Sequence, residues 1–188
     1  MSKRCLEVAA REAGRTPAVA WHAFLLHPEF PRAPHDFEAA FVAKYGQGAR
    51  VPVWDDVMAR GEAVGIRFRF YEIEHGFNSV DAHRLVRLAG RIGEEDAMIE
   101  RLFSAFFEEC RYLGDLELLA DLGAEAGLDR ADTLARLRSE EGLPAIYEAG
   151  EAARRDPGVS GVPFHLVDSA PWRPGDTSLA AYRGLLAR

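Results

Sequence analysis

GVSGVPF, residues 158–164, bears most directly on the fold, because it puts a proline at the entry of an apolar run that ends at Val167. Residues 164–167 are typical of a short, buried strand. Proline lacks the backbone N–H that a sheet uses, so it is normally excluded from strand interiors. Two interpretations follow from these residues alone. The strand begins at Pro163, or the Val162–Pro163 bond is cis and its geometry is needed.

The composition is that of a globular protein of one domain, or of one core with a large insertion. The chain has 188 residues, 48% of them hydrophobic and 28% charged. Its net charge of −7, with no basic cluster interleaved with aromatics, argues against nucleic acid or an anionic membrane as partner. Residues 1–14 have no signal-peptide pattern, and the apolar residues 16–28 are too few to cross a bilayer. We therefore expect a cytoplasmic protein.

The reactive side chains form no recognisable catalytic or metal-binding motif. The two cysteines, Cys5 and Cys110, lie far apart and outside any CxxC or CxxH pattern, which argues against a disulfide scaffold and a zinc knuckle. Both are expected to be small, half-buried residues of amphipathic helices. His22, His27 and Glu29 are too irregularly spaced for a metal site, so no metal is expected.

Hydrophobic spacing predicts a mostly helical chain with strands near its two ends. Alternation at Val19, Trp21 and Ala23 predicts a strand over residues 19–24. Residues 66–77 fit either a strand or an extended connector, and Asn78 with Asp81 resembles a capping box. No clear strand follows residue 167, where residues 169–176 read as a loop. Helices are predicted over residues 3–13, 37–45, 52–64, 79–90, 98–113, 116–126, 130–141, 144–155 and 177–188.

This order of elements predicts an α/β fold in two parts. Residues 1–30 and 156–188 would form a small α/β core. Residues 31–155 would form an all-helical insertion within it.

Five segments carry a resemblance to a known family: SKRCLEVA (2–9), FLLHPEFP (24–31), NSVDAHRLVRLAG (78–90), residues 102–129, and GVSGVPF (158–164). Together they resemble the DsbA family of thioredoxin-fold proteins. The most similar subfamily is the FrnE-like oxidoreductases, related to 2-hydroxychromene-2-carboxylate isomerases and kappa-class glutathione transferases. The resemblance covers nearly the whole chain and implies a thioredoxin-like core without its first strand.

The resemblance also implies a ligand site. Pro163 would be cis and face that site, and Val162 would offer its backbone to a thiol or disulfide substrate protein or to glutathione. Asn78 and Ser79 would line the cleft, although helix capping is the simpler role for both. His83 would tune a thiolate, or serve only as a structural hydrogen-bonding group.

Several residues depart from the family pattern. The family's catalytic CxxC, or the serine of its isomerase and transferase branches, has no counterpart in the sequence, so no catalytic residue is assigned. His27 stands where asparagine is common, which puts glutathione binding in doubt, and His165 stands where an apolar residue is usual.

Two explanations for the absent motif remain open. Either the sequence is an N-terminally shortened form of a longer protein, or this family member has lost the part of the fold that carries the redox motif. The leading expectation is a FrnE-like thiol–disulfide oxidoreductase. Without the CxxC, the 188 residues themselves are expected to be redox-inactive. The alternatives are a glutathione-dependent isomerase or transferase, with glutathione as the only expected cofactor, and a non-catalytic binding module. Because so small a core leaves strand edges free, we also expect that it could form a homodimer.

Overall fold

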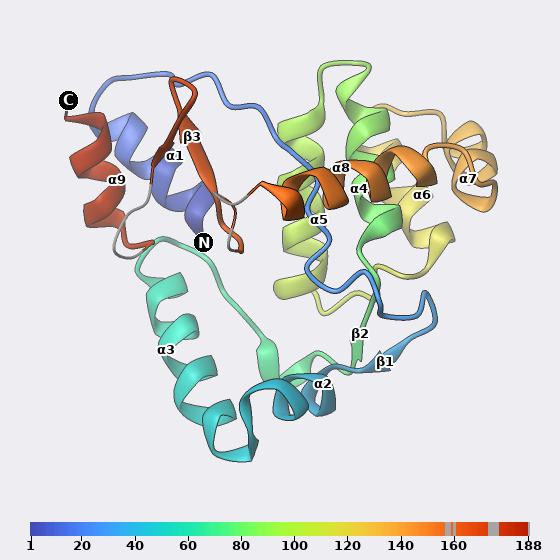
Figure 1. Ribbon diagram of the computed structural model, residues 1–188, viewed down its shortest axis with the longest axis horizontal. Helices are drawn as coiled ribbons and strands as arrows, with labels where there is room; N and C mark the ends of the chain where they lie inside the picture. The colour runs from blue at the N-terminus through green and yellow to red at the C-terminus, as the bar shows by residue number, and fades with distance from the viewer. Residues whose placement is uncertain (157–158, 160, 173–176, 188) are drawn as a thin grey trace.

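The computed structural model describes residues 1–156, 159, 161–172 and 177–187, and these residues are mostly helical (Figure 1). The helices of the described chain are α1 (Ser2–Glu12), α2 (Phe37–Tyr45), α3 (Arg50–Glu62), α4 (Val80–Gly90), α5 (Glu95–Phe107), α6 (Leu116–Glu125), α7 (Arg130–Arg138), α8 (Leu143–Arg155) and α9 (Leu179–Leu186), with short 3-10 turns at Gln47–Ala49 and Phe70–Glu72.

Within the described residues, the strands form two small antiparallel pairs. β1 (His35–Asp36) pairs with β2 (His75–Gly76). β3 (His165–Val167) pairs with β4 (Ala170–Trp172), so that His165 lies opposite Trp172. Parts of the predicted segments 158–164, 169–176 and 177–188, together with Pro157, lie outside the described residues.

Local sequence signals set several helix ends as predicted. Asp36 begins α2, where its carboxylate accepts the Ala39 N–H at 2.7 Å, and Asp129 begins α7 by accepting the Asp132 N–H at 2.8 Å. The chain leaves α1 at Gly14 and α6 at Gly127, whose φ angles of 62° and 92° lie in the left-handed region that favours glycine. These helices are therefore encoded by short stretches of sequence.

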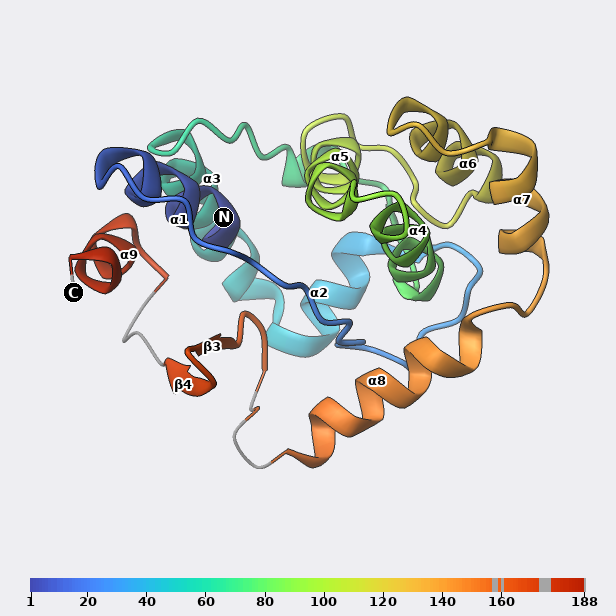
Figure 2. The same ribbon diagram turned by 90° about the horizontal axis from the view of Figure 1, so that it is seen from above.

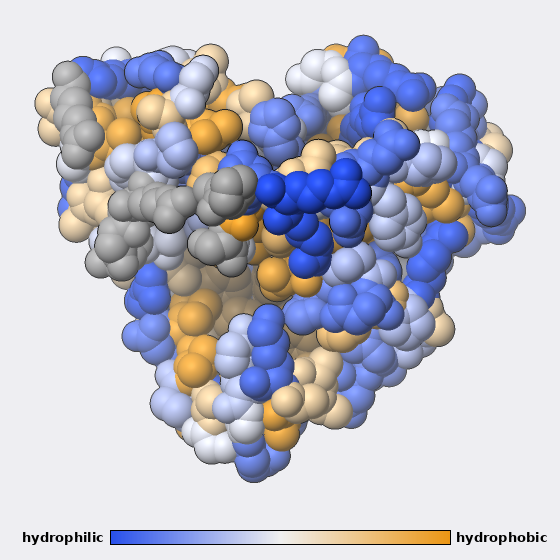
Figure 3. Space-filling view, viewed as in Figure 1, coloured by the Kyte–Doolittle hydropathy of each residue, from blue (hydrophilic) through white to orange (hydrophobic). Residues whose placement is uncertain are grey.

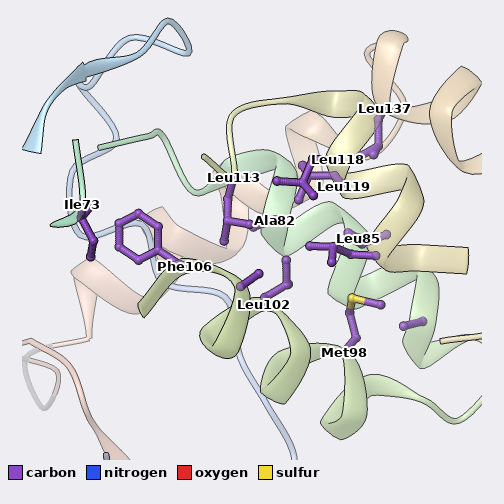
Figure 4. Packing of buried hydrophobic residues seen from close by; sticks show 13 residues of the cluster. Ile73, Ala82, Leu85, Met98, Leu102, Phe106, Leu113, Leu118, Leu119 and Leu137 are labelled. Carbon is purple, nitrogen blue, oxygen red and sulfur yellow. The ribbon is translucent and has the colours of Figure 1, made fainter. Parts of the chain in front are cut away.

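The largest hydrophobic core lies among the helices α4 to α7 (Figure 4). Leu85 of α4, Met98 of α5 and Leu119 of α6 are fully buried in it, and Leu137 of α7 is 1% exposed. Burying a leucine or methionine side chain contributes about 1.5–3 kcal/mol. This cluster therefore supplies much of the driving force for folding.

A second, smaller core joins the two ends of the described chain. α1 and α9 lie side by side, as Figures 1 and 2 both show, with Cys5, Ala9 and Tyr182 buried between them. The β3–β4 pair contacts this core through Trp172. A third cluster links Leu25 to Val80 of α4 and Ile146 of α8.

The strand predicted over residues 19–24 is wrong. The segment is extended but belongs to neither sheet of the described chain. Side chains hold it instead. The Trp21 indole donates to Asp96 of α5 at 3.2 Å, and Arg154 of α8 donates to the carbonyls of Leu25 and, at 3.1 Å, Leu26. A strand needs a partner edge, and alternation in one segment cannot supply it.

Two further expectations are corrected, and the alternative left open for residues 66–77 is decided in favour of a connector. A second strand does follow residue 167, because β4 turns back onto β3 through Asp168 and Ser169, both at positive φ. Cys110 lies beyond the end of α5 at φ 56°, not within a helix. Residues 66–77 form a connector that contains only one turn of 3-10 helix and the two residues of β2.

Candidate functional site

The Val162–Pro163 peptide bond is cis and lies at the surface, just before β3. Val162 is 52% exposed, and its backbone makes no hydrogen bond with another described residue. Among the described residues, β3 is paired on one edge only, by β4. Leu166, 58% exposed, also points away from the core. The segment therefore presents a free backbone edge with apolar side chains beside it.

The opposite face of β3 is anchored in the protein. The His165 ring packs edge-on against Trp172 and Tyr182, with centroid separations of 5.3 and 5.6 Å. Its Nε2 lies 3.0 Å from the Tyr182 hydroxyl of α9. Figure 3 shows hydrophobic residues among hydrophilic ones on the part of the surface formed by β3, α1 and α9, at the upper left.

Asn78 is buried at the start of α4, and its amide is fully engaged. Its Nδ2 donates to the Phe30 carbonyl at 2.6 Å, and its Oδ1 accepts the Val80 N–H at 3.0 Å. Ser79 is the N-cap residue, but its side chain makes no capping bond. The expected capping box is therefore wrong in detail. Asn78 supplies the cap, and Asp81 bonds Arg32 and Arg84 instead of the Asn78 backbone.

His83 lies one turn further along α4 and contacts the extended segment through the Phe24 backbone. Burial lowers the pKa of His83, and the hydrogen bond with Phe24 opposes that shift. The sequence-predicted residues thus form two groups. Asn78, Ser79 and His83 lie along α4, Val162 and Pro163 precede β3, and no described hydrogen bond or ion pair joins the groups.

Comparisons with known proteins decide the family. The model of the DSBA-like thioredoxin domain matches residues 2–187. The chain belongs to the DSBA-like thioredoxin domain family. The crystal structure of a probable DsbA oxidoreductase from Streptomyces coelicolor is similar, with a TM-score of 0.83 and 23% sequence identity. The match covers 99% of this chain and 82% of the S. coelicolor chain. That likeness shows a shared DsbA-type thioredoxin-like fold. A comparison with curated proteins found no match.

Neither cysteine of this DSBA-like domain has the environment of an active nucleophile. Cys5 is 1% exposed, and burial raises the pKa of its thiol. Burial also raises the pKa of Cys110, whose Sγ donates weakly to the Arg69 carbonyl at 3.7 Å. The thiolate is the reactive form, so both cysteines are poorly suited to attack a disulfide.

No cluster of potential metal ligands occurs in the described part of the chain. None of its helices is long and apolar enough to cross a membrane. A cavity of about 110 Å³ lies between α4, α7 and α8, and a more open hollow of about 630 Å³ lies beside Trp21. Val162 and Pro163 line neither of them. The candidate site is thus an exposed strand edge and not an enclosed pocket.

Two structurally important side chains were missed at the sequence level. Arg84 is 3% exposed and bonds four backbone carbonyls as well as Asp81. The spacing of Asp81 and Arg84, three residues apart on one helix, was the available signal. Tyr182 is fully buried against His165, and a histidine inside an apolar strand was the only hint of that pair.

Proposed function

We propose that this chain carries the substrate-positioning elements of a FrnE-like thiol–disulfide oxidoreductase, with the backbone at Val162 as the binding edge. The free edge of Val162 beside Pro163, in a chain of the DSBA-like family, is the observation that supports this most directly. An extended substrate segment would pair with that edge as an added strand. Val162 and Leu166 would then contact alternate side chains of the substrate.

Disulfide exchange needs a thiolate that attacks one sulfur of the substrate disulfide and releases the other as a thiolate. The 188 residues contain no CxxC, and both thiols have raised pKa values. We therefore propose that this chain holds a substrate strand but does not perform the exchange itself. Asn78, Ser79 and His83 of α4 remain a separate proposal as substrate-binding residues, because no described hydrogen bond or ion pair joins them to Val162 or Pro163.

The binding proposal is tested with an acetylated and amidated pentapeptide that carries a central S-methylthio-cysteine between apolar residues. NMR titration of the full chain should shift the amides of residues 161, 162 and 164–167. Val162→Glu should weaken binding about tenfold or more, because a carboxylate on the edge must be desolvated when the peptide docks. Val51→Glu is the matched control, since Val51 of α3 is 49% exposed, and it should bind as the native chain does.

Three outcomes would contradict the proposal. The first is unchanged peptide affinity in Val162→Glu. The second is binding of glutathione but not of the peptide, which would favour the isomerase or transferase alternative. The third is disulfide-reductase activity that survives in a Cys5→Ser, Cys110→Ser double variant, because the chain would then use chemistry outside the proposal.

A further inference from the structure

His165 connects the proposed binding edge to the packed ends of the chain. It lies in β3, three residues after Val162, and its Nε2 is 3.0 Å from the Tyr182 hydroxyl. Tyr182 is fully buried and packs against Cys5 and Ala9 of α1. The Tyr182 side chain also hydrogen-bonds the Ser2 side chain in the first turn of α1. A continuous polar link therefore runs from β3 through α9 to the start of α1.

The surroundings of His165 favour the neutral imidazole. Its Nδ1 is buried and has no hydrogen-bond partner among the described residues. Burial is the cause of its lowered pKa. In the neutral ring whose Nε2–H donates to the Tyr182 oxygen, Nδ1 carries no proton, so protonation would add an N–H there with no described acceptor, in a partly buried place, and such a group is costly.

No described carboxylate forms an ion pair or hydrogen bond with His165 that would balance the charge of its protonated ring. β4 contributes Trp172, α9 contributes Tyr182, and α1 contributes Ser2 and Cys5. The charged groups that act on Cys5 are the Met1 amino group and Arg60 of α3, and both are positive. Protonating His165 would thus place a positive charge in a partly buried site where no described carboxylate acts on the ring.

We propose that His165 is a positioning residue that holds the Val162 edge in its binding geometry only while its ring is neutral. As the pH falls further below about 6.5, the ordinary value for histidine, charging the ring becomes progressively less costly until solvent protons charge it. The charged ring would leave its place against Tyr182, and β3 would loosen. This inference rests on the proposed function for its consequence, which is peptide binding that weakens in acid. The link itself can be tested in the free protein.

The experiment uses the full chain and the same capped peptide, which has no titrating group between pH 5.5 and 7.5. In the free native chain, the amide signals of residues 165–167 should shift with the titration of the His165 ring. Peptide affinity should fall severalfold between pH 7.5 and 5.5. His165→Gln keeps a neutral hydrogen-bonding group, so it should remove both changes, and His165→Phe serves as a second variant of similar apolar volume.

His75→Gln is the control, because His75 is an exposed histidine of β2. It should keep the native pH dependence. Tyr182→Phe should weaken binding at pH 7.5, because it cuts the link while leaving His165 in place. The inference is overturned if the β3 amides do not follow the His165 titration, or if His165→Gln and His165→Phe stay as pH-dependent as the native chain. Absence of peptide binding at both pH values, with the amide titration intact, would instead count against the proposed function alone.

Discussion

Arg84 shows how one side chain can complete a fold in this protein. Its guanidinium lies in the interior and donates to the carbonyls of Arg136, Leu137, Ser139 and Glu141, at 2.5 to 2.9 Å. Those carbonyls belong to the end of α7 and the turn into α8, where the regular helical N–H donors run out, although the Arg136 carbonyl also accepts the Ser139 N–H at 3.1 Å. Asp81, which also bonds Arg32 at 2.6 Å, balances the charge. Arg84 therefore fixes α7 and α8 against α4.

Arg84→Lys should destabilise the chain by about 2–4 kcal/mol, because a single ammonium cannot reach all four carbonyls and the carboxylate. Chemical denaturation followed by circular dichroism measures this loss. Arg87→Lys is the matched control, since Arg87 is exposed one turn along the same helix. It should change stability by less than about 0.5 kcal/mol. Equal losses in the two variants would refute the role given to Arg84.

Among the elements, the extended segment before Pro28 shows how a strand-like sequence is stabilised without a sheet. Arg154 donates to the carbonyls of Leu25 and Leu26, and its guanidinium lies 5.2 Å from the Phe24 ring centroid. Leu25 itself is 2% exposed and packs against α4 and α8. The segment is therefore held by one buried leucine and by donors from α8.

Arg154→Gln should loosen this segment locally rather than unfold the chain. Losing the charged donor at a partly exposed site should cost about 1 kcal/mol, which corresponds to roughly fivefold faster hydrogen exchange at the backbone amides nearby. Exchange of the Leu25 and Leu26 amides measures the effect. Arg155→Gln, the next residue of α8, is the control. Exchange that is unchanged in Arg154→Gln would mean that packing of Leu25 alone holds the segment.

The elements that could be predicted are those encoded within a few residues. Asp36 and Asp129 each cap a helix through an amide three residues away, so α2 and α7 follow from local sequence. The prediction of a strand at 19–24 failed because residues 19–24 carry no information about whether a partner strand lies beside them. The prediction of a capping box between Asn78 and Asp81 failed because Asp81 pairs with Arg32, which lies 49 residues earlier in the chain. Long-range partners decide such cases.

For the molecule as a whole, the resemblance anticipated the family and the fold, which the DSBA-like domain match bears out. Pro163 could be singled out because a proline beside an apolar strand is unusual. The buried pair of His165 and Tyr182 could not be, because it joins two segments whose approach depends on how α1 and α9 pack. Sequence patterns thus singled out the exposed edge of the proposed site but not the side chains that anchor it.

Protonation should change the stability of the whole chain between pH 7.5 and 5.5. Burial lowers the pKa values of His35, His83 and His165. Each of these groups binds a proton more readily in the unfolded chain, so stability is full above about pH 6.5 and falls as the pH drops below it. Paired carboxylates such as Glu100, whose pKa is lowered overall, lose their contribution only below about pH 4.5, outside this window.

Thermal unfolding at pH 7.5, 6.5 and 5.5 tests this expectation. A loss of 1 kcal/mol lowers the Tm of a chain of this size by about 2–4 °C, so the fall should be measurable. His83→Gln should reduce the fall, because one of the three partly buried imidazoles no longer titrates, whereas His75→Gln should leave it as it is in the native chain. A Tm that rises or stays constant down to pH 5.5 would mean that these imidazoles accept protons in the folded state without cost. In that case, the neutral His165 ring would also lose its role as the anchor of the binding edge.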